Sequence, residues 1–149
     1  MQIGGGDPAD RASTLGNVLC MAGGVISWCA AKARTPALSS AESEYMALCE
    51  GAKSIMFTRM LLSEIGFDVQ EPTTIYVDNR SAIAMGSGLQ SSSRTKHIEI
   101  RLHYTRHLVR EGSIQLKWIQ SSDNIADIMT KPLGRVAYEK LRDQIMSEQ

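Results

Sequence analysis

The stretch Thr73–Ala84, T-T-I-Y-V-D-N-R-S-A-I-A, constrains the fold more than any other part of the 149-residue chain. Its first residues are β-branched or aromatic and follow Glu71-Pro72, which predicts a short strand. Asp78 comes where that strand ends, and Asn79 or Asp78 itself can cap a short helix that begins directly afterwards. Ligands of α/β sheets bind beside the carboxyl ends of strands, so Asp78 is a candidate site residue. Taken alone, a helix cap is the simpler role for this side chain.

Length and composition indicate a single domain over residues 1–149, with 43% apolar and 21% charged residues. The formal net charge is +0, so binding to nucleic acid would need a local basic face. Cys20, Cys29 and Cys49 lack C-x-x-C spacing, which predicts free thiols in a reducing compartment. No apolar run approaches the roughly 20 residues of a membrane span, and the N-terminus lacks a signal-peptide pattern. We therefore expect a soluble intracellular protein without a membrane partner, in either the cytoplasm or the nucleus.

A long helix is predicted over residues 39–65, with Gly66 as its stop signal. Ser39 and Glu42 form an S-x-x-E capping box at its start. An advance of about 100° per residue places Glu44 on the apolar stripe and Glu42 on the opposite side. A carboxylate directed at a core needs a partner, a metal ion or a proton. The alternative is that water still reaches Glu44 because it lies near the helix end.

The remaining segments predict further strands and helices around this framework. A hairpin is predicted from two strand-like segments, Ser13–Met21 and Val25–Ala30, which are joined by a turn at Ala22-Gly23-Gly24. A strand is expected over residues 113–119, a helix start over 125–130 and a final amphipathic helix over 135–146. Asp127 falls in the first turn of the 125–130 helix, where it could simply complement the helix dipole.

A second long helix, over residues 94–111, concentrates positive charge in a chain with no net charge. Such a local basic surface is typical of phosphate contact. A solvated helix face explains the same composition equally well. If the first explanation holds, the residues that contact nucleic acid include Arg94, Lys96, His97 and Arg101.

Glu44, Asp78 and Asp127 together could hold two divalent ions. Mg²⁺ prefers oxygen ligands and keeps several waters, so a few carboxylates are sufficient. Two such ions can activate a water molecule and stabilise the leaving oxygen of a phosphodiester.

Four sequence blocks carry a family resemblance: A-L-S-S-A-E-S-E-Y-M-A-L (Ala37–Leu48), I-Y-V-D-N-R-S-A-I-A (Ile75–Ala84), S-R-T-K-H-I-E-I-R-L-H-Y (Ser93–Tyr104) and A-D-I-M-T-K-P-L (Ala126–Leu133). In this order they closely resemble the ribonuclease H domain of copia-type LTR retrotransposon Pol polyproteins. The resemblance implies an α/β fold, with a ribonuclease H-like mixed β-sheet flanked by helices. It also implies hydrolysis of the RNA strand of RNA–DNA hybrids during reverse transcription, beside the reverse transcriptase domain of the same polyprotein. Catalysis in the family depends on Mg²⁺, with Mn²⁺ as an alternative ion, and Glu44, Asp78 and Asp127 match three of its four acidic ligands.

The first aspartate of the family set has no counterpart, because Met1-Gln2-Ile3-Gly4 stands in its place. Most of the first, central strand is therefore expected to be missing, and loss of this carboxylate should impair catalysis. Residues Met1–Gly6 fill part of the gap, a second chain supplies a strand, or the domain is marginally stable. Asp7 or Asp10 could act as a substitute ligand, although the turn chemistry of Asp7-Pro8 argues against it. The alternative function is a catalytically inactive retroelement remnant that at most binds nucleic acid through its basic helix.

Overall fold

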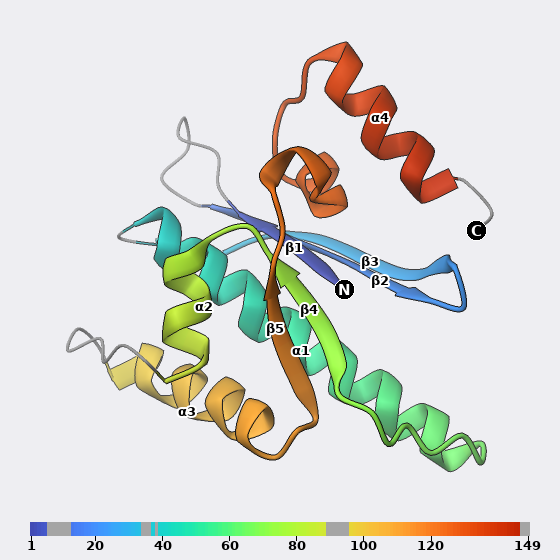
Figure 1. The fold of residues 1–149 in the computed structure, drawn as a ribbon. Coiled ribbons are helices and arrows are strands. Elements are labelled where there is room, and N and C mark those ends of the chain that lie inside the picture. The colour runs from blue at the N-terminus through green and yellow to red at the C-terminus, as the bar shows by residue number, and fades with distance from the viewer. Residues whose placement is uncertain (6–12, 34–36, 38, 89–95, 147–149) are drawn as a thin grey trace.

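A computed structural model of the chain describes residues 1–5, 13–33, 37, 39–88 and 96–146, with the side chains of 2–5 and 96–102 left undescribed. Its centre is a five-stranded sheet in the order β3-β2-β1-β4-β5 (Figure 1). The first three strands pair antiparallel and the last three pair parallel, so the predicted mixed α/β sheet is confirmed. The strands are β1 (Gln2–Gly5), β2 (Thr14–Met21), β3 (Gly24–Lys32), β4 (Thr73–Val77) and β5 (Ile114–Trp118).

Strand β1 lies between β2 and β4, where the sequence predicts a gap in the sheet (Figure 1). It pairs with β2 from Gln2↔Val18 to Gly5↔Leu15. On its other side, the Met1 amine donates to the Thr74 carbonyl at 3.0 Å, and the Met1 carbonyl accepts from Tyr76 N–H at 2.7 Å. The N-terminal residues themselves therefore fill part of the gap. The strand is short rather than missing, with 4 residues against 8 in β2, and the sheet is continuous from β3 to β5 within one chain.

The predicted hairpin of β2 and β3 is confirmed, with pairing from Thr14↔Lys32 to Met21↔Gly24. Its turn residues Ala22 and Gly23 have φ angles of 51° and 83°. Positive φ at both central residues matches the twist of the strands that a two-residue turn connects.

Helix α1 (Ser40–Glu64) covers one face of the sheet and carries the larger core. Its N-cap is Ser39, whose Oγ accepts the Glu42 N–H at 3.1 Å, as the capping box predicts. Gly66, at φ 89°, follows its C-terminal end. Helices α2 (Arg80–Gly86) and α3 (Lys96–Arg110) pack against α1 and contribute to the same core. No helix in the described ranges is long and apolar enough to cross a membrane.

The opposite face is covered by α4 (Arg135–Met146) and the 3₁₀ helix η2 (Ile125–Met129), which follows the 3₁₀ helix η1 (Ser121–Asp123) in the chain (Figure 1). The helix start predicted over 125–130 is confirmed in the form of the 3₁₀ helix η2. Gly16 of β2 allows η2 to approach closely, because a Cβ at this position would clash with Thr130 Cγ2 and lie 3.2 Å from Met129 Cβ. The buried apolar residues of this smaller core are Val18, Ile125, Ala126 and Leu141.

Candidate functional site

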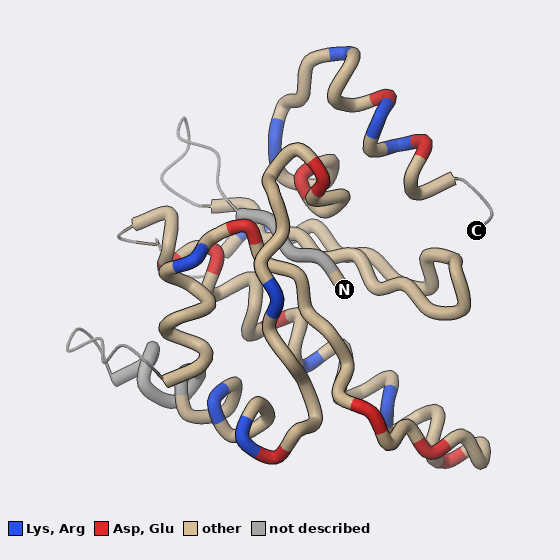
Figure 2. Tube along the Cα trace, viewed as in Figure 1, with Lys and Arg blue, Asp and Glu red and all other residues tan. Residues whose placement is uncertain are grey.

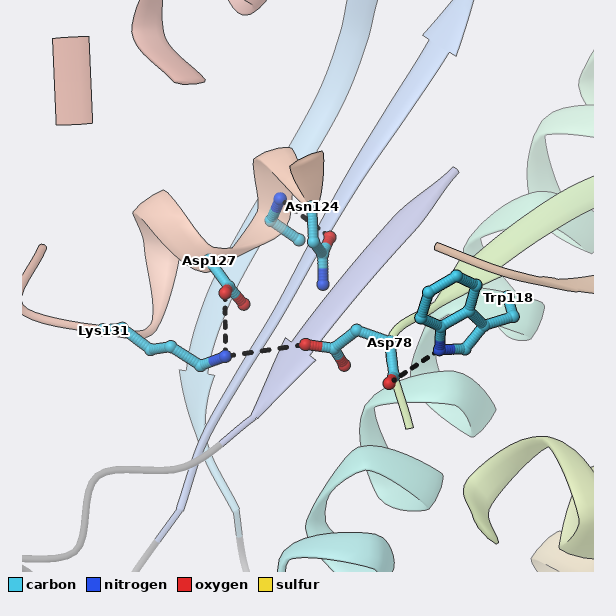
Figure 3. A network of polar contacts seen from close by, with 6 residues as sticks. Asp78, Trp118, Asn124, Asp127 and Lys131 are labelled. Carbon is cyan, nitrogen blue, oxygen red and sulfur yellow. Dashed lines mark hydrogen bonds and ion pairs between the residues drawn. The ribbon is translucent and has the colours of Figure 1, made fainter. Parts of the chain in front are cut away.

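Asp78 directly follows the last residue of β4, at the carboxyl end of a strand in the middle of the sheet. The cap of α2 is Asn79, whose Oδ1 accepts the N–H groups of Ser81 at 2.9 Å and Ala82 at 3.1 Å. The simpler role for Asp78, that of a helix cap, is therefore wrong. The Asp78 carboxylate instead points away from α2, and its side chain is only 8% exposed (Figure 3).

Asp127 reaches the same place from η2 on the opposite face. The residue is 4% exposed, so it does more than complement a helix dipole at the surface. Lys131 Nζ donates to Asp127 Oδ2 at 2.8 Å and lies 3.7 Å from Asp78 Oδ2 (Figure 3). The second carboxylate oxygen, Asp127 Oδ1, is buried and has no hydrogen-bond partner among the described residues. One ammonium group thus joins two carboxylates that are far apart in the sequence; we call Asp78, Asp127 and Lys131 the acidic centre.

Glu44 approaches the acidic centre from α1. It is 4% exposed, so the alternative in which water still reaches this side chain is wrong. Its negative charge acts on Lys131 and helps to raise the pKa of that ammonium group. Glu42, the neighbouring acidic residue, is only partly buried at the capping position. The helix-face argument that favours Glu44 over Glu42 as the inward carboxylate is consistent with this burial.

The acidic centre holds more negative charge than its ammonium group offsets. Burial raises the pKa of Asp127 and the charge of Asp78 raises it further, although Lys131 acts in the opposite direction. Burial alone would lower the pKa of Lys131, but the hydrogen bond and charge of Asp127, followed by the charges of Asp78 and Glu44, raise it. An ion pair by itself would lower the pKa of its acid. The opposite direction at Asp127 follows because burial penalises the charged carboxylate more than the Lys131 ammonium stabilises it.

The donor chemistry of the acidic centre suits a hard divalent ion such as Mg²⁺, which prefers oxygen ligands. Asp127 Oδ1, buried and without a hydrogen-bond partner in the described ranges, is one such donor. Within these ranges, however, no group of three His, Cys, Asp or Glu side chains is gathered closely enough to hold an ion. The structure thus brings Asp78 and Asp127 together around Lys131 without placing Glu44 in a three-carboxylate group with them. Asp7 and Asp10, the substitute ligands, lie outside the described residues.

The predicted nucleic-acid contacts fall on residues whose side chains the structure does not describe. At the described end of α3, Arg106 Nε donates to the Met85 carbonyl at 2.8 Å, which ties α3 to α2. Along α4, Arg135, Lys140 and Arg142 are interspersed with Glu139 and Asp143 (Figure 2). Outside the description are Arg94 and the side chains of Lys96, His97 and Arg101.

Two residues beside the predicted carboxylates are not indicated by the sequence patterns as part of a site. One is Lys131, for which the only signal is its i,i+4 spacing from Asp127. The other is Trp118 at the end of β5, whose Nε1 donates to the Asp78 carbonyl at 3.3 Å (Figure 3). The Arg80 guanidinium lies 4.7 Å from the centroid of the Trp118 ring, within cation–π range. Only the β4–β5 register, Val77↔Trp118, places this indole beside Asp78.

Comparison with known proteins gives both relatives and structural neighbours, although no family model matches the chain. The retrovirus-related Pol polyprotein from transposon TNT 1-94 of Nicotiana tabacum is 33% identical over 140 residues, which cover 94% of this chain and 10% of the polyprotein. The chain therefore spans about a tenth of the length of the curated relative that it matches.

Solved structures share its fold at low sequence identity. The N-terminal RNase H domain of a Mycobacterium tuberculosis protein has a TM-score of 0.62 and 14% identity, with 95% of this chain and 94% of that one covered. LC11-RNase H1, solved in complex with an RNA/DNA hybrid, has a TM-score of 0.62 and 14% identity, with 86% and 90% covered.

Proposed function

We propose that this chain, which belongs to the ribonuclease H domains of copia-type retrotransposon Pol polyproteins, hydrolyses the RNA strand of RNA–DNA hybrids. The ribonuclease H-like fold and the Pol polyprotein homology support a ribonuclease H domain. The observation that carries the proposed activity is the meeting of Asp78 and Asp127 around one ammonium group, beside the carboxyl end of β4, an interior strand of the sheet. The hybrid bound to LC11-RNase H1 supports this class of substrate, and the polyprotein relatives support a reverse transcriptase domain as partner.

Asp78 and Asp127, with Glu44 nearby, would hold Mg²⁺ or Mn²⁺ through their carboxylate oxygens. When bound, such ions supply an activated water and stabilise the leaving oxygen of the phosphodiester. The contribution of the chain is to fix the carboxylates before substrate arrives. The indole N–H of Trp118 holds the backbone carbonyl of Asp78, and the close packing of η2 on Gly16 fixes the segment that carries Asp127.

A second candidate function is nucleic-acid binding by an inactive remnant of the same domain. Two observations favour it. The family's first aspartate has no counterpart in the sequence, and no three-carboxylate group is gathered within the described part of the chain. This candidate keeps the fold and the substrate class but removes turnover.

The test is cleavage of a labelled RNA–DNA hybrid in Mg²⁺ and in Mn²⁺, beside Asp78→Asn and Asp127→Asn. We expect cleavage by the unchanged chain that falls to background in both variants, because each removes a metal-binding oxygen charge. Asp123→Asn is the matched control, since Asp123 is a half-exposed carboxylate that pairs with Lys140 at 2.6 Å. A folded chain that binds the hybrid without cutting it in either metal would favour the inactive remnant.

A further inference from the structure

We propose that Lys131 is a built-in cation of the acidic centre, which a divalent ion has to displace when it binds between Asp78 and Asp127. The inference rests on the proposed function for the identity of the ligand and deepens it by naming what regulates metal binding. Without the metal, Lys131 contacts the carboxylates of Asp78 and Asp127 and is therefore a positioning residue. It acts on the carboxylates rather than on the substrate.

The distances show that an ammonium group and a metal ion compete for one place. Lys131 Nζ lies 2.8 Å from Asp127 Oδ2 and 3.7 Å from Asp78 Oδ2, between the two carboxylates (Figure 3). Mg²⁺ binds carboxylate oxygens at about 2.0–2.1 Å. An ion that bridges the same two oxygens would therefore overlap the volume that Nζ fills.

The backbone explains how Lys131 reaches this place. The N–H groups of Thr130 and Lys131 both donate to the Asp127 carbonyl, at 3.1 Å and 3.0 Å. This tight turn directs the Lys131 side chain back over the carboxylate of Asp127. Displacement also has a route, because the Lys131 side chain is 32% exposed whereas those of Asp78 and Asp127 are 8% and 6% exposed. The ammonium can therefore move into water, whereas the two carboxylates are held in the buried part of the site.

The charges and hydrogen bonds show why a divalent ion should win this competition. Lys131 satisfies only one oxygen of Asp127, and Oδ1 stays buried without a hydrogen bond from any described residue. A buried acceptor in that state is costly. The single positive charge also faces two carboxylates, with Glu44 acting on it as a third. A doubly charged ion attracts each carboxylate more strongly at the same distance.

The test is calorimetric titration of MnCl₂ into the full chain and into Lys131→Met, which keeps an unbranched apolar stem and removes the charge. We expect the variant to bind Mn²⁺ about tenfold more tightly, which is within the usual range of coupling between two ligands. Without metal, the variant should melt at a lower temperature than the unchanged chain and gain more from added Mn²⁺. Lys131→Arg, which keeps the charge, should bind Mn²⁺ no more tightly than the unchanged chain.

Lys140→Met is the matched control, because it removes another lysine–aspartate pair, at 2.6 Å, whose two side chains are about half exposed. Its Mn²⁺ affinity should equal that of the unchanged chain. Equal or weaker Mn²⁺ binding by Lys131→Met would overturn the displacement model and leave the metal centre standing. Absence of Mn²⁺ binding in every folded chain would overturn both this inference and the proposed function.

A second measurement uses the unchanged chain and does not depend on the folding of a variant. Mn²⁺ should free the Lys131 ammonium, so acetylation of Lys131 should become faster relative to that of Lys140, as measured by peptide mass spectrometry. A relative rate that Mn²⁺ leaves unchanged or lowers would contradict the displacement of Lys131.

Discussion

The two faces of the sheet are covered unequally, yet each places a buried carboxylate in or beside the acidic centre. The α1 face buries a broad core that includes Tyr45, Leu48 and Ile55, each at most 1% exposed. On the other face, the buried cluster in the described ranges is confined to Val18, Ile125, Ala126 and Leu141. Glu44 comes from the first face and Asp127 from the second. The face under α1 is stabilised mainly by its large buried apolar area. The face under α4 and η2, which we call the thin face, relies on the close packing of η2 on the backbone of Gly16 to position Asp127.

The largest expected effect compares one leucine from each face. Leu48→Ala should lower the free energy of unfolding by about 4 kcal/mol, because the dense α1 core cannot close the cavity. Leu141→Ala should cost about 2 kcal/mol, because α4 can shift toward the sheet with fewer neighbours to resist it. Both side chains are nearly fully buried, at 0% and 2% exposure, so the chemistry removed is the same. Urea unfolding measures both, and equal losses would show that the two faces are equally rigid.

The next effect concerns the contact that holds η2 on the thin face. Gly16→Ala should destabilise the chain by about 2 kcal/mol, because the added methyl group clashes with Thr130 and crowds Met129. Since η2 carries Asp127, the same change should also weaken Mn²⁺ binding.

Gly24→Ala is the control for this change, because a Cβ at Gly24 meets nothing within 4 Å. Denaturant unfolding and Mn²⁺ titration are run on both variants. If Gly16→Ala lowered stability but left Mn²⁺ affinity intact, the position of Asp127 would not depend on this packing.

Local signals explain which parts of the fold follow from the sequence. The hairpin turn and the Ser39 cap each depend on residues within a few positions of one another in the sequence, and both predictions are confirmed. Strand β1 is different, because Gln2–Gly5 contains two glycines and no alternating apolar pattern. It becomes a strand only through pairing with β2 and β4, which follow it in the sequence. A strand that depends on pairing with other segments cannot be recognised from its own few residues.

The acidic centre divides in the same way. Asp78 and Glu44 are indicated by a strand end and by a helix face, and burial of both agrees with those patterns. The ion pair between Lys131 and Asp127 is compatible with their i,i+4 spacing in the sequence. The contact of Lys131 with Asp78, in contrast, depends on how η2 packs across the sheet. Trp118 depends entirely on the parallel register of β4 and β5. Residues that complete a site from a second element are therefore the ones that sequence patterns miss.

A smaller effect is expected from the indole that holds Asp78 on the sheet side of the centre. Trp118→Phe keeps an aromatic ring over Arg80 and removes the N–H that donates to the Asp78 carbonyl. We expect a loss of about 0.5 kcal/mol in the free energy of unfolding, because the bond is partly exposed to water. The rate of hybrid cleavage should fall by a larger factor than the equilibrium constant of folding. Trp28→Phe, at a residue 66% exposed on β3, is the control and should change neither quantity.

The smallest effect is a pH dependence that separates burial from ion pairing on the thin face. In the folded chain the pKa of Asp127 is raised from its ordinary 3.8, with burial as the main cause. Above pH 3.8 the unfolded chain releases this proton while the folded chain retains it. Stability should therefore fall as pH rises through the interval between 3.8 and the raised pKa.

The measurement is urea unfolding without metal, as the difference between the unchanged chain and Asp127→Asn across that interval. Subtraction of the variant isolates Asp127 from the other carboxylates, and Lys131 does not interfere because its own pKa is raised from 10.5, far above the interval. A surface carboxylate in an ion pair would give the opposite pH dependence, because its pKa is lowered in the folded chain and the stability that it contributes is lost in acid. A difference that rises with pH would mean that Lys131 outweighs burial at Asp127. In that case the thin face would be held by its ion pair, and the contrast with the α1 face would rest on charge rather than on packing.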